Sequence, residues 1–187
     1  MTDRLNEFVA RVTAAVASNA NEPQLLEEVK EAMQSLVATD DWLPAELAAP
    51  HPERYQQYLL HCDPRERFSV VSFIWGPGQQ TPIHDHTVWG VIGMLRGAEL
   101  GQAYRRTPEG MVAQGEPERL NPGDVAVVSP RIGDIHQVSN AFDDRVSVSV
   151  HVYGTNIGRQ SRHVFDPQSG AMKAFVSGYA NEPKATA

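Results

Sequence analysis

The chain has 187 residues, 41% of them hydrophobic, and a formal net charge of −7. This length suits one well-buried domain, so residues 1–187 are treated as a single unit. The acidic balance, without a run of lysine or arginine, argues against nucleic acid or an anionic membrane as the main partner. No apolar run is long enough to span a membrane, the N-terminus lacks a signal-peptide pattern, and a single cysteine, Cys62, fits a reducing compartment. We therefore expect a cytoplasmic protein that acts on small molecules.

The first 50 residues are predicted to be helical. Apolar residues recur at helical spacing over residues 2–18 and 23–37, and a short helical piece is expected near residues 44–48. Neither long segment carries side chains that point to chemistry. We therefore place the functional part of the chain after the helices.

From residue 55 to about residue 175 the pattern changes from helical to alternating, and turn signals recur every eight to twelve residues. This is typical of an antiparallel β-sandwich or β-barrel, in which functional side chains converge on the interior. The fold class we predict is mainly β, with N-terminal α-helices. Strands are expected at residues 55–61, 68–75, 89–95, 99–105, 111–114, 124–128, 136–139 and 145–153.

Two histidines one residue apart, His84 and His86, lie in a segment that reads as extended. Alternate side chains of a strand share a face, so the two imidazoles project together and can share one metal, while Asp85 turns away. The pair alone is weak evidence, because the chain has seven histidines. A further histidine, His136, follows a turn that contains proline and glycine. Residues 78–97 and 130–140 together resemble the two cupin motifs, which implies a jelly-roll barrel and a metal held by His84, His86 and His136.

The loop after His86 departs from most metal cupins, which carry a glutamate ligand there. This chain has Thr87-Val88-Trp89-Gly90 instead, so the implied ligand set is three neutral histidines. Such a set leaves the full charge on the metal and favours an anionic ligand from solution, such as a thiolate or carboxylate. That combination is characteristic of thiol dioxygenases.

Three polar residues, Ser149, His151 and Tyr153, alternate with valines on one predicted strand. Periodicity alone favours a solvent-facing side of a half-buried strand. The run Ser-Val-His-Val-Tyr is similar to that of cysteine dioxygenases and their bacterial relatives, in which these side chains bond in series beside an iron ion. The resemblance spans residues 55–170. It implies Fe(II) as the cofactor, a Tyr153 hydroxyl that donates toward the substrate and oxygen side, and a His151 that orients it.

Two further positions bear on the substrate. Where cysteine dioxygenases place an arginine for the substrate carboxylate, this chain has Gln57, so it resembles the glutamine-type bacterial branch associated with 3-mercaptopropionate. Arg162 falls where that branch carries an arginine, and the resemblance implies that it binds the carboxylate. From residue type alone, Arg162 reads as a surface ion pair, and Gln57 as a residue that satisfies backbone groups.

The single cysteine bears on a covalent modification. The mammalian-type enzymes carry, shortly after the H-x-H pair, a cysteine that becomes linked to the tyrosine. Cys62 lies elsewhere, so no thioether to Tyr153 is expected. The remaining histidines, His51, His61 and His163, are interpreted as structural or solvated.

The sequence thus predicts an Fe(II) thiol dioxygenase that uses O2 to convert a small thiol carboxylate, 3-mercaptopropionate, to a sulfinic acid. Oxidation of L-cysteine is the nearest alternative. A cupin enzyme that uses Zn, Mn or Ni is a second, because three histidines do not identify the metal. A third, from a different class, is a non-catalytic metal-binding cupin module that senses a small ligand, because a fold does not fix its function.

Overall fold

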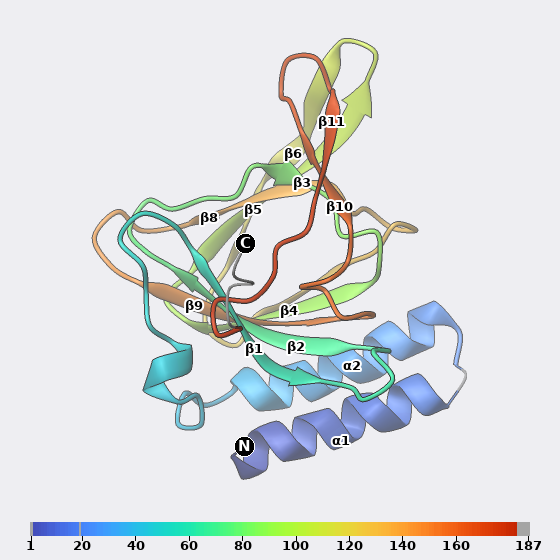
Figure 1. Cartoon of the computed structure of the whole chain (residues 1–187), viewed down its shortest axis with the longest axis vertical. Helices are drawn as coiled ribbons and strands as arrows, with labels where there is room; N and C mark the ends of the chain where they lie inside the picture. The colour runs from blue at the N-terminus through green and yellow to red at the C-terminus, as the bar shows by residue number, and fades with distance from the viewer. Residues whose placement is uncertain (1, 19, 183–187) are drawn as a thin grey trace.

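The N-terminal part forms two helices that pack side by side beneath the rest of the chain (Figure 1). The computed structural model describes residues 2–18 and 20–182. Helix α1 spans Asp3–Ala17 and α2 spans Glu22–Val37. The Asn21 side chain caps α2 by accepting a hydrogen bond from the backbone of Gln24, and a single 3-10 turn, η1, follows at Ala45–Leu47. Both predicted helices are confirmed.

The remainder forms two antiparallel sheets. The first has the order β1-β2-β9-β4-β7, with bounds Gln56–Cys62, Ser69–Trp75, Ser147–Tyr153, Gly90–Arg96 and Val125–Val128. The second has the order β11-β10-β3-β8-β5-β6, with bounds Met172–Phe175, Arg162–Phe165, Ile83–His84, His136–Asn140, Glu99–Thr107 and Gly110–Leu120. Sequence neighbours are often separated in these orders, as in a jelly-roll barrel. The predicted fold class, mainly β with N-terminal helices, is confirmed.

The central strands of the first sheet are buried on both faces. One face, which includes Val148, Val150 and Val152, packs with the helices into one hydrophobic core. Helix α2 lies against β4 so closely that a Cβ on Gly93 would stand 2.6 Å from the Met33 side chain. The other face turns into the barrel, which explains why all seven residues of β9 are buried. Periodicity alone favoured a solvent-facing side for this strand, and that interpretation is therefore wrong.

Three strands, β3, β10 and β11, were not predicted; they have two to four residues each. The shortest, β3, is fixed by its neighbours: His84 pairs with Val164 on one side and with His136 on the other. Within the described residues, no helix is long and apolar enough to cross a membrane.

Candidate metal centre and substrate pocket

The three predicted ligands converge inside the barrel. His84, His86 and His136 each offer one ring nitrogen, and these three atoms lie within 4.8 Å of one another. Two of the residues are Cα partners on adjacent strands, and His86 enters from the turn that follows β3. Three imidazoles at this separation match the donor set of a metal site that keeps positions open for other ligands.

The imidazoles are held ready to bind a metal. Burial, reinforced by the neighbouring His86, lowers the pKa of His84 to about 3, and burial likewise places the pKa of His136 well below its ordinary value. Both rings are therefore neutral at pH 7 and have a free lone pair. The Nδ1 of His84 lies 3.0 Å from the carbonyl of Pro82, which leaves Nε2 of that ring for the metal.

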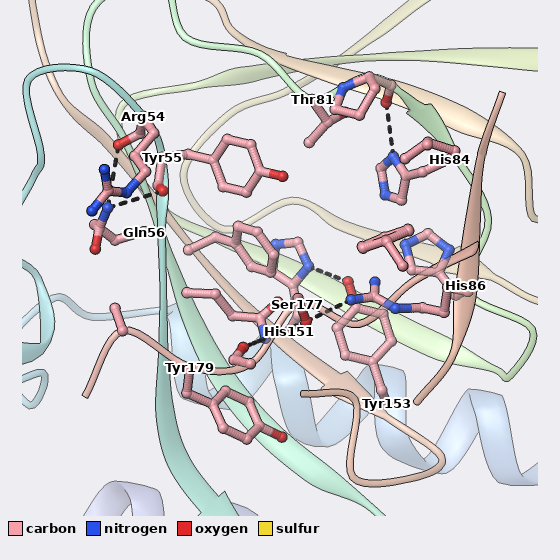
Figure 2. A pocket seen from close by; sticks show the side chains of 18 of the residues that line it. Arg54, Tyr55, Gln56, Thr81, His84, His86, His151, Tyr153, Ser177 and Tyr179 are labelled. Atoms are coloured by element: carbon pink, nitrogen blue, oxygen red, sulfur yellow. Dashed lines mark hydrogen bonds between the residues drawn. The ribbon is translucent and has the colours of Figure 1, made fainter. Parts of the chain in front are cut away.

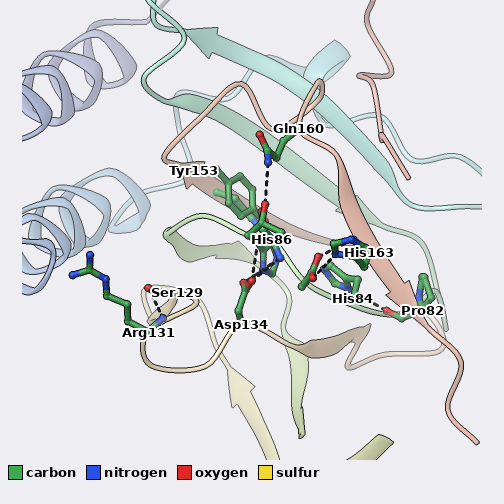
Figure 3. A network of polar contacts seen from close by, with 12 residues as sticks. Pro82, His84, His86, Ser129, Arg131, Asp134, Tyr153, Gln160 and His163 are labelled. Atoms are coloured by element: carbon green, nitrogen blue, oxygen red, sulfur yellow. Dashed lines mark hydrogen bonds and ion pairs between the residues drawn. The ribbon is translucent and has the colours of Figure 1, made fainter. Parts of the chain in front are cut away.

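A carboxylate that the sequence interpretation missed, Asp134, fixes the third ligand (Figure 3). It contacts the His86 Nδ1 at 2.8 Å and accepts hydrogen bonds from the backbone N–H groups of His86 and Thr87. These bonds hold Thr87 at a φ of 62°, a conformation that β-branched residues rarely adopt. Although burial would raise the pKa of Asp134, hydrogen bonds from His86 and Thr87 keep it lowered, so the group stays a carboxylate. Asp134 precedes β8, which begins at His136, so no strand alternation marked it in the sequence.

Asp85 turns away from the histidines, as predicted. Its carboxylate accepts a hydrogen bond from the backbone of His163 at 2.7 Å and contacts the Nδ1 of that ring at 2.8 Å. His163 does not line the pocket, and the pair joins the turn after β3 to β10. The structural interpretation of His163 agrees with these contacts.

The polar residues of β9 form a continuous chain of hydrogen bonds beside the histidines. Ser149 Oγ lies 2.8 Å from His151 Nε2, and His151 Nδ1 lies 2.8 Å from the Tyr153 hydroxyl. Burial places the pKa of His151 well below its ordinary value and raises that of Tyr153, so both groups are neutral at pH 7. The Tyr153 ring stacks on His86 with 5.2 Å between centroids. This series of hydrogen bonds therefore ends at Tyr153, next to the candidate metal ligands.

Arg162 is a buried cation in the same pocket. It is only 3% exposed, and its guanidinium lies 4.7 Å from the centre of the Phe175 ring. One hydrogen bond, from Nη2 to the Ser177 hydroxyl, measures 2.7 Å, while the buried Nε has no partner. Among the described residues, no carboxylate forms an ion pair with it. A buried guanidinium without an anion is costly, so this site favours an anionic ligand.

Gln57 lies in the first strand and binds the segment that follows β11. Its Nε2 donates to the carbonyl of Gly178 at 3.0 Å and to the Ser177 hydroxyl at 3.3 Å. Ser177 is thus shared with Arg162. The backbone N–H of Ala180 donates to the carbonyl of Gln57. The Asn181 side chain accepts a hydrogen bond from the backbone N–H of Leu59 and donates one to its carbonyl. Residues 177–181 therefore form a wall of the pocket that is fastened to β1.

These groups line one cavity of about 550 Å³ (Figure 2). Besides the three histidines, its lining includes Gln57, His151, Tyr153 and Arg162. Two tyrosines that the sequence interpretation overlooked, Tyr55 and Tyr179, also line it. Every predicted site residue except Ser149 lies on this cavity, and Ser149 joins it through His151. The space suits a small molecule with one charged end.

Cys62 lies outside the cavity. In the first sheet Cys62 pairs with Ser69, which pairs with Tyr153, so the cysteine is two strands away from the tyrosine, roughly 10 Å. The first residue of β4, Gly90, lies so close to the tyrosine that a Cβ there would stand 2.7 Å from the Tyr153 ring. The geometry thus gives Cys62 no route to a thioether with Tyr153.

A jelly-roll barrel that gathers three histidines around one point defines a cupin with a candidate metal centre. The chain matches the cysteine dioxygenase type I family over residues 3–165, and it therefore belongs to that family. Among curated proteins it is similar to cysteine dioxygenase type 1 of Danio rerio, with 27% identity over 151 residues that cover 78% of this chain and 72% of the relative.

Solved structures give further similarities. A Klebsiella pneumoniae protein with a double-stranded β-helix domain is 17% identical, covering 72% of this chain and 96% of that one, with a TM-score of 0.48. A cupin superfamily protein from Desulfitobacterium hafniense is 14% identical, covering 63% and 94%, with a TM-score of 0.47.

Proposed function

We propose that this protein is an Fe(II)-dependent thiol dioxygenase whose substrate is 3-mercaptopropionate and whose product is the corresponding sulfinic acid. The observation that carries the proposal is the buried Arg162, which has no anionic partner among residues 2–18 and 20–182 and faces the same cavity as the three histidines. The two groups match the two ends of a short thiol carboxylate, because the histidine site takes the sulfur and the guanidinium takes the carboxylate.

The charges around Arg162 favour a substrate without an α-amino group. Among the described residues that line the cavity, the only acidic one is Glu182, in the segment that follows the pocket wall. The ammonium group of L-cysteine would therefore enter a pocket that already contains a cation, Arg162, and the amide donors of Gln57. Like charges in a desolvated site repel strongly, so cysteine should be the poorer substrate.

Each polar residue then has a distinct role. His84, His86 and His136 would hold the iron, which supplies a Lewis acid that favours thiolate and a centre that activates O2. Arg162 binds and orients the carboxylate, and Gln57 holds Ser177 against it. Tyr153 directs its hydroxyl to the place where negative charge develops on oxygen, and His151 and Ser149 orient that hydroxyl.

Two other interpretations predict different measurements. A Zn, Mn or Ni cupin would retain that metal on purification and would not consume O2 with thiols. A ligand-sensing module would bind the thiol without forming sulfinate. We further propose a cytoplasmic location and small-molecule partners only, supported by the net charge of −7 and by the small cavity.

The test compares three thiols with the iron-loaded full chain by O2 uptake and by mass spectrometry of the sulfinate. We expect kcat/KM to be higher for 3-mercaptopropionate than for L-cysteine. Arg162→Ala removes a charge-assisted hydrogen bond worth roughly 1.5 to 3 kcal/mol, which lowers kcat/KM for 3-mercaptopropionate about ten- to a hundredfold. Cysteamine, which has no carboxylate, should be insensitive to this change.

Arg159→Ala is the matched control, because Arg159 lies on the same segment and its side chain is 69% exposed. Its kinetics should equal those of the wild type with all three thiols. Equal kcat/KM for cysteine and 3-mercaptopropionate in the wild type would disprove the substrate assignment. Loss of cysteamine turnover in Arg162→Ala would show that the arginine supports the fold and not the carboxylate.

A further inference from the structure

A buried carboxyl group lies at the far end of the hydrogen-bond chain of β9. Glu99, the first residue of β5, is 3% exposed, and its Oε2 has no hydrogen-bond partner in the part of the chain that the structure describes. Burial raises the pKa of Glu99 to about 7, although the Ser149 hydroxyl and the Trp75 indole act in the opposite direction. The group that adjoins Ser149 can therefore change its charge near neutral pH.

Glu99 does not line the substrate pocket. It lines a second cavity of about 460 Å³, which shares His136 with the first. The other titratable or charged groups in the wall of this second cavity are Tyr104, Arg105, Glu118, Asp134 and His136. None of these five groups shifts the pKa of Glu99. A proton can thus reach or leave Glu99 on the side away from the substrate.

The donors and acceptors along the chain permit two arrangements. The Trp75 indole only donates, and it donates to Ser149 Oγ at 3.1 Å, while His151 Nε2 lies 2.8 Å from the same oxygen. Because Ser149 also acts on the Glu99 carboxyl, its single hydrogen can be directed to His151 or to Glu99. A carboxylate at Glu99 takes that hydrogen. His151 then donates from Nε2 to Ser149, and its Nδ1 accepts the hydroxyl hydrogen of Tyr153.

Protonation of Glu99 reverses the direction of each hydrogen bond from Glu99 to Tyr153, while Trp75 still donates to Ser149. The protonated Glu99 donates to Ser149, which then donates to Nε2 of His151, and the Nδ1–H of that ring donates to the oxygen of Tyr153. The hydroxyl hydrogen of Tyr153 is then free to point into the substrate pocket. His151 stays neutral in both arrangements, because burial places its pKa well below the ordinary value.

We propose that Glu99 is a positioning residue that sets the direction of the chain from Ser149 through His151 to Tyr153. When Glu99 is protonated, Tyr153 donates into the pocket; when Glu99 is a carboxylate, Tyr153 presents a lone pair. The arrangement with protonated Glu99 holds one hydrogen more than the arrangement with the carboxylate, and solvent supplies that proton as the pH falls. No proton is transferred to the substrate. The catalytic consequence rests on the proposed function, whereas the reversal itself does not.

The reversal is measured by 15N NMR of His151 in the full chain loaded with Zn(II), a diamagnetic ion that three histidines bind. Between about pH 6 and about pH 8, the proton in the wild type should move from Nδ1 to Nε2. In Glu99→Gln, which cannot ionise, His151 should keep one tautomer throughout. Ser149→Ala interrupts the chain with Glu99 intact, and it should also abolish the change.

Glu118→Gln is the matched control, because it removes a carboxylate from the wall of the same cavity without touching the chain. Its tautomer change should equal that of the wild type. A wild-type His151 with one tautomer across this pH range overturns the proposal, as does a change that persists in both Glu99→Gln and Ser149→Ala.

Turnover gives the second measurement. Because protonated Glu99 is the form that lets Tyr153 donate, kcat of the wild type should fall about tenfold as pH rises from about 6 to about 8. In Glu99→Gln this fall should shrink to less than about twofold. An unchanged fall in that variant contradicts the catalytic role of Glu99. If the wild type forms no sulfinate at all, the proposed function fails, while the NMR result still decides the reversal.

Discussion

The two faces of strand β9 are equally buried yet chemically opposite. Val148, Val150 and Val152 pack with the helices in one hydrophobic core, whereas Ser149, His151 and Tyr153 point into the barrel. Burial of a polar side chain is costly unless it is hydrogen-bonded, and all three polar residues are. The valine face therefore belongs to the hydrophobic core, whereas the polar face borders the pocket. Substitutions on the two faces should have separable effects.

The largest effect is expected at the metal ligands, which the polar face adjoins. His136→Ala removes one of three imidazoles, so iron binding and turnover should both fall to background. Metal analysis and O2 uptake measure the two losses. His163→Ala is the control, because His163 binds Asp85 outside the pocket, and it should retain iron. Wild-type iron and turnover in His136→Ala would falsify the three-histidine site.

An intermediate effect is expected at the end of the polar face. Tyr153→Phe keeps the ring that stacks on His86 and removes only the hydroxyl. If that hydroxyl stabilises charge that develops during the reaction, kcat should fall roughly ten- to a thousandfold with little change in KM. Steady-state kinetics at equal iron content measure this. A normal kcat would mean that the polar face has a structural role alone.

The smallest effect on turnover is expected on the valine face. Val150→Ala leaves a cavity against the helices, so the free energy of unfolding should fall by roughly 2 to 3 kcal/mol. Urea unfolding measures this loss, and kcat at a temperature where the variant is folded should match the wild type. If kcat fell more in Val150→Ala than in Tyr153→Phe, the two faces of β9 would not have separate roles.

Much of the fold was accessible from local pattern. Both helices were placed from the spacing of their apolar residues, and the longer strands from alternation between turns. Strand β3 has only two residues, too few for any alternation, and its pairing is set by β8 and β10, which are distant in sequence. The burial of the polar face of β9 could not be predicted from periodicity either. Alternation shows that the two faces of a strand differ, but it does not show what covers each face.

The site divides in the same way. His84, His86 and His136 were found because their spacing resembles a known pattern, and the structure brings the three rings together. Asp134 and Glu99 were missed, because an acidic residue near a turn usually faces solvent and only tertiary contacts show otherwise. The resemblance thus identified the three candidate ligands, whereas Asp134 and Glu99 could be recognised only in the three-dimensional structure.

The wall formed by residues 177–181 bears on how the pocket assembles. Gln57 and Ser177, which bond across it, are 120 positions apart in the chain, and Leu59 and Asn181 are 122 apart. Closing a loop of this length costs conformational entropy before the contact contributes any stabilisation, so such contacts form slowly. The barrel and its histidines can therefore assemble before the Arg162 end of the pocket is closed. In hydrogen exchange, the amides of Leu59 and Ala180 should accordingly open at lower free energy than those of β9.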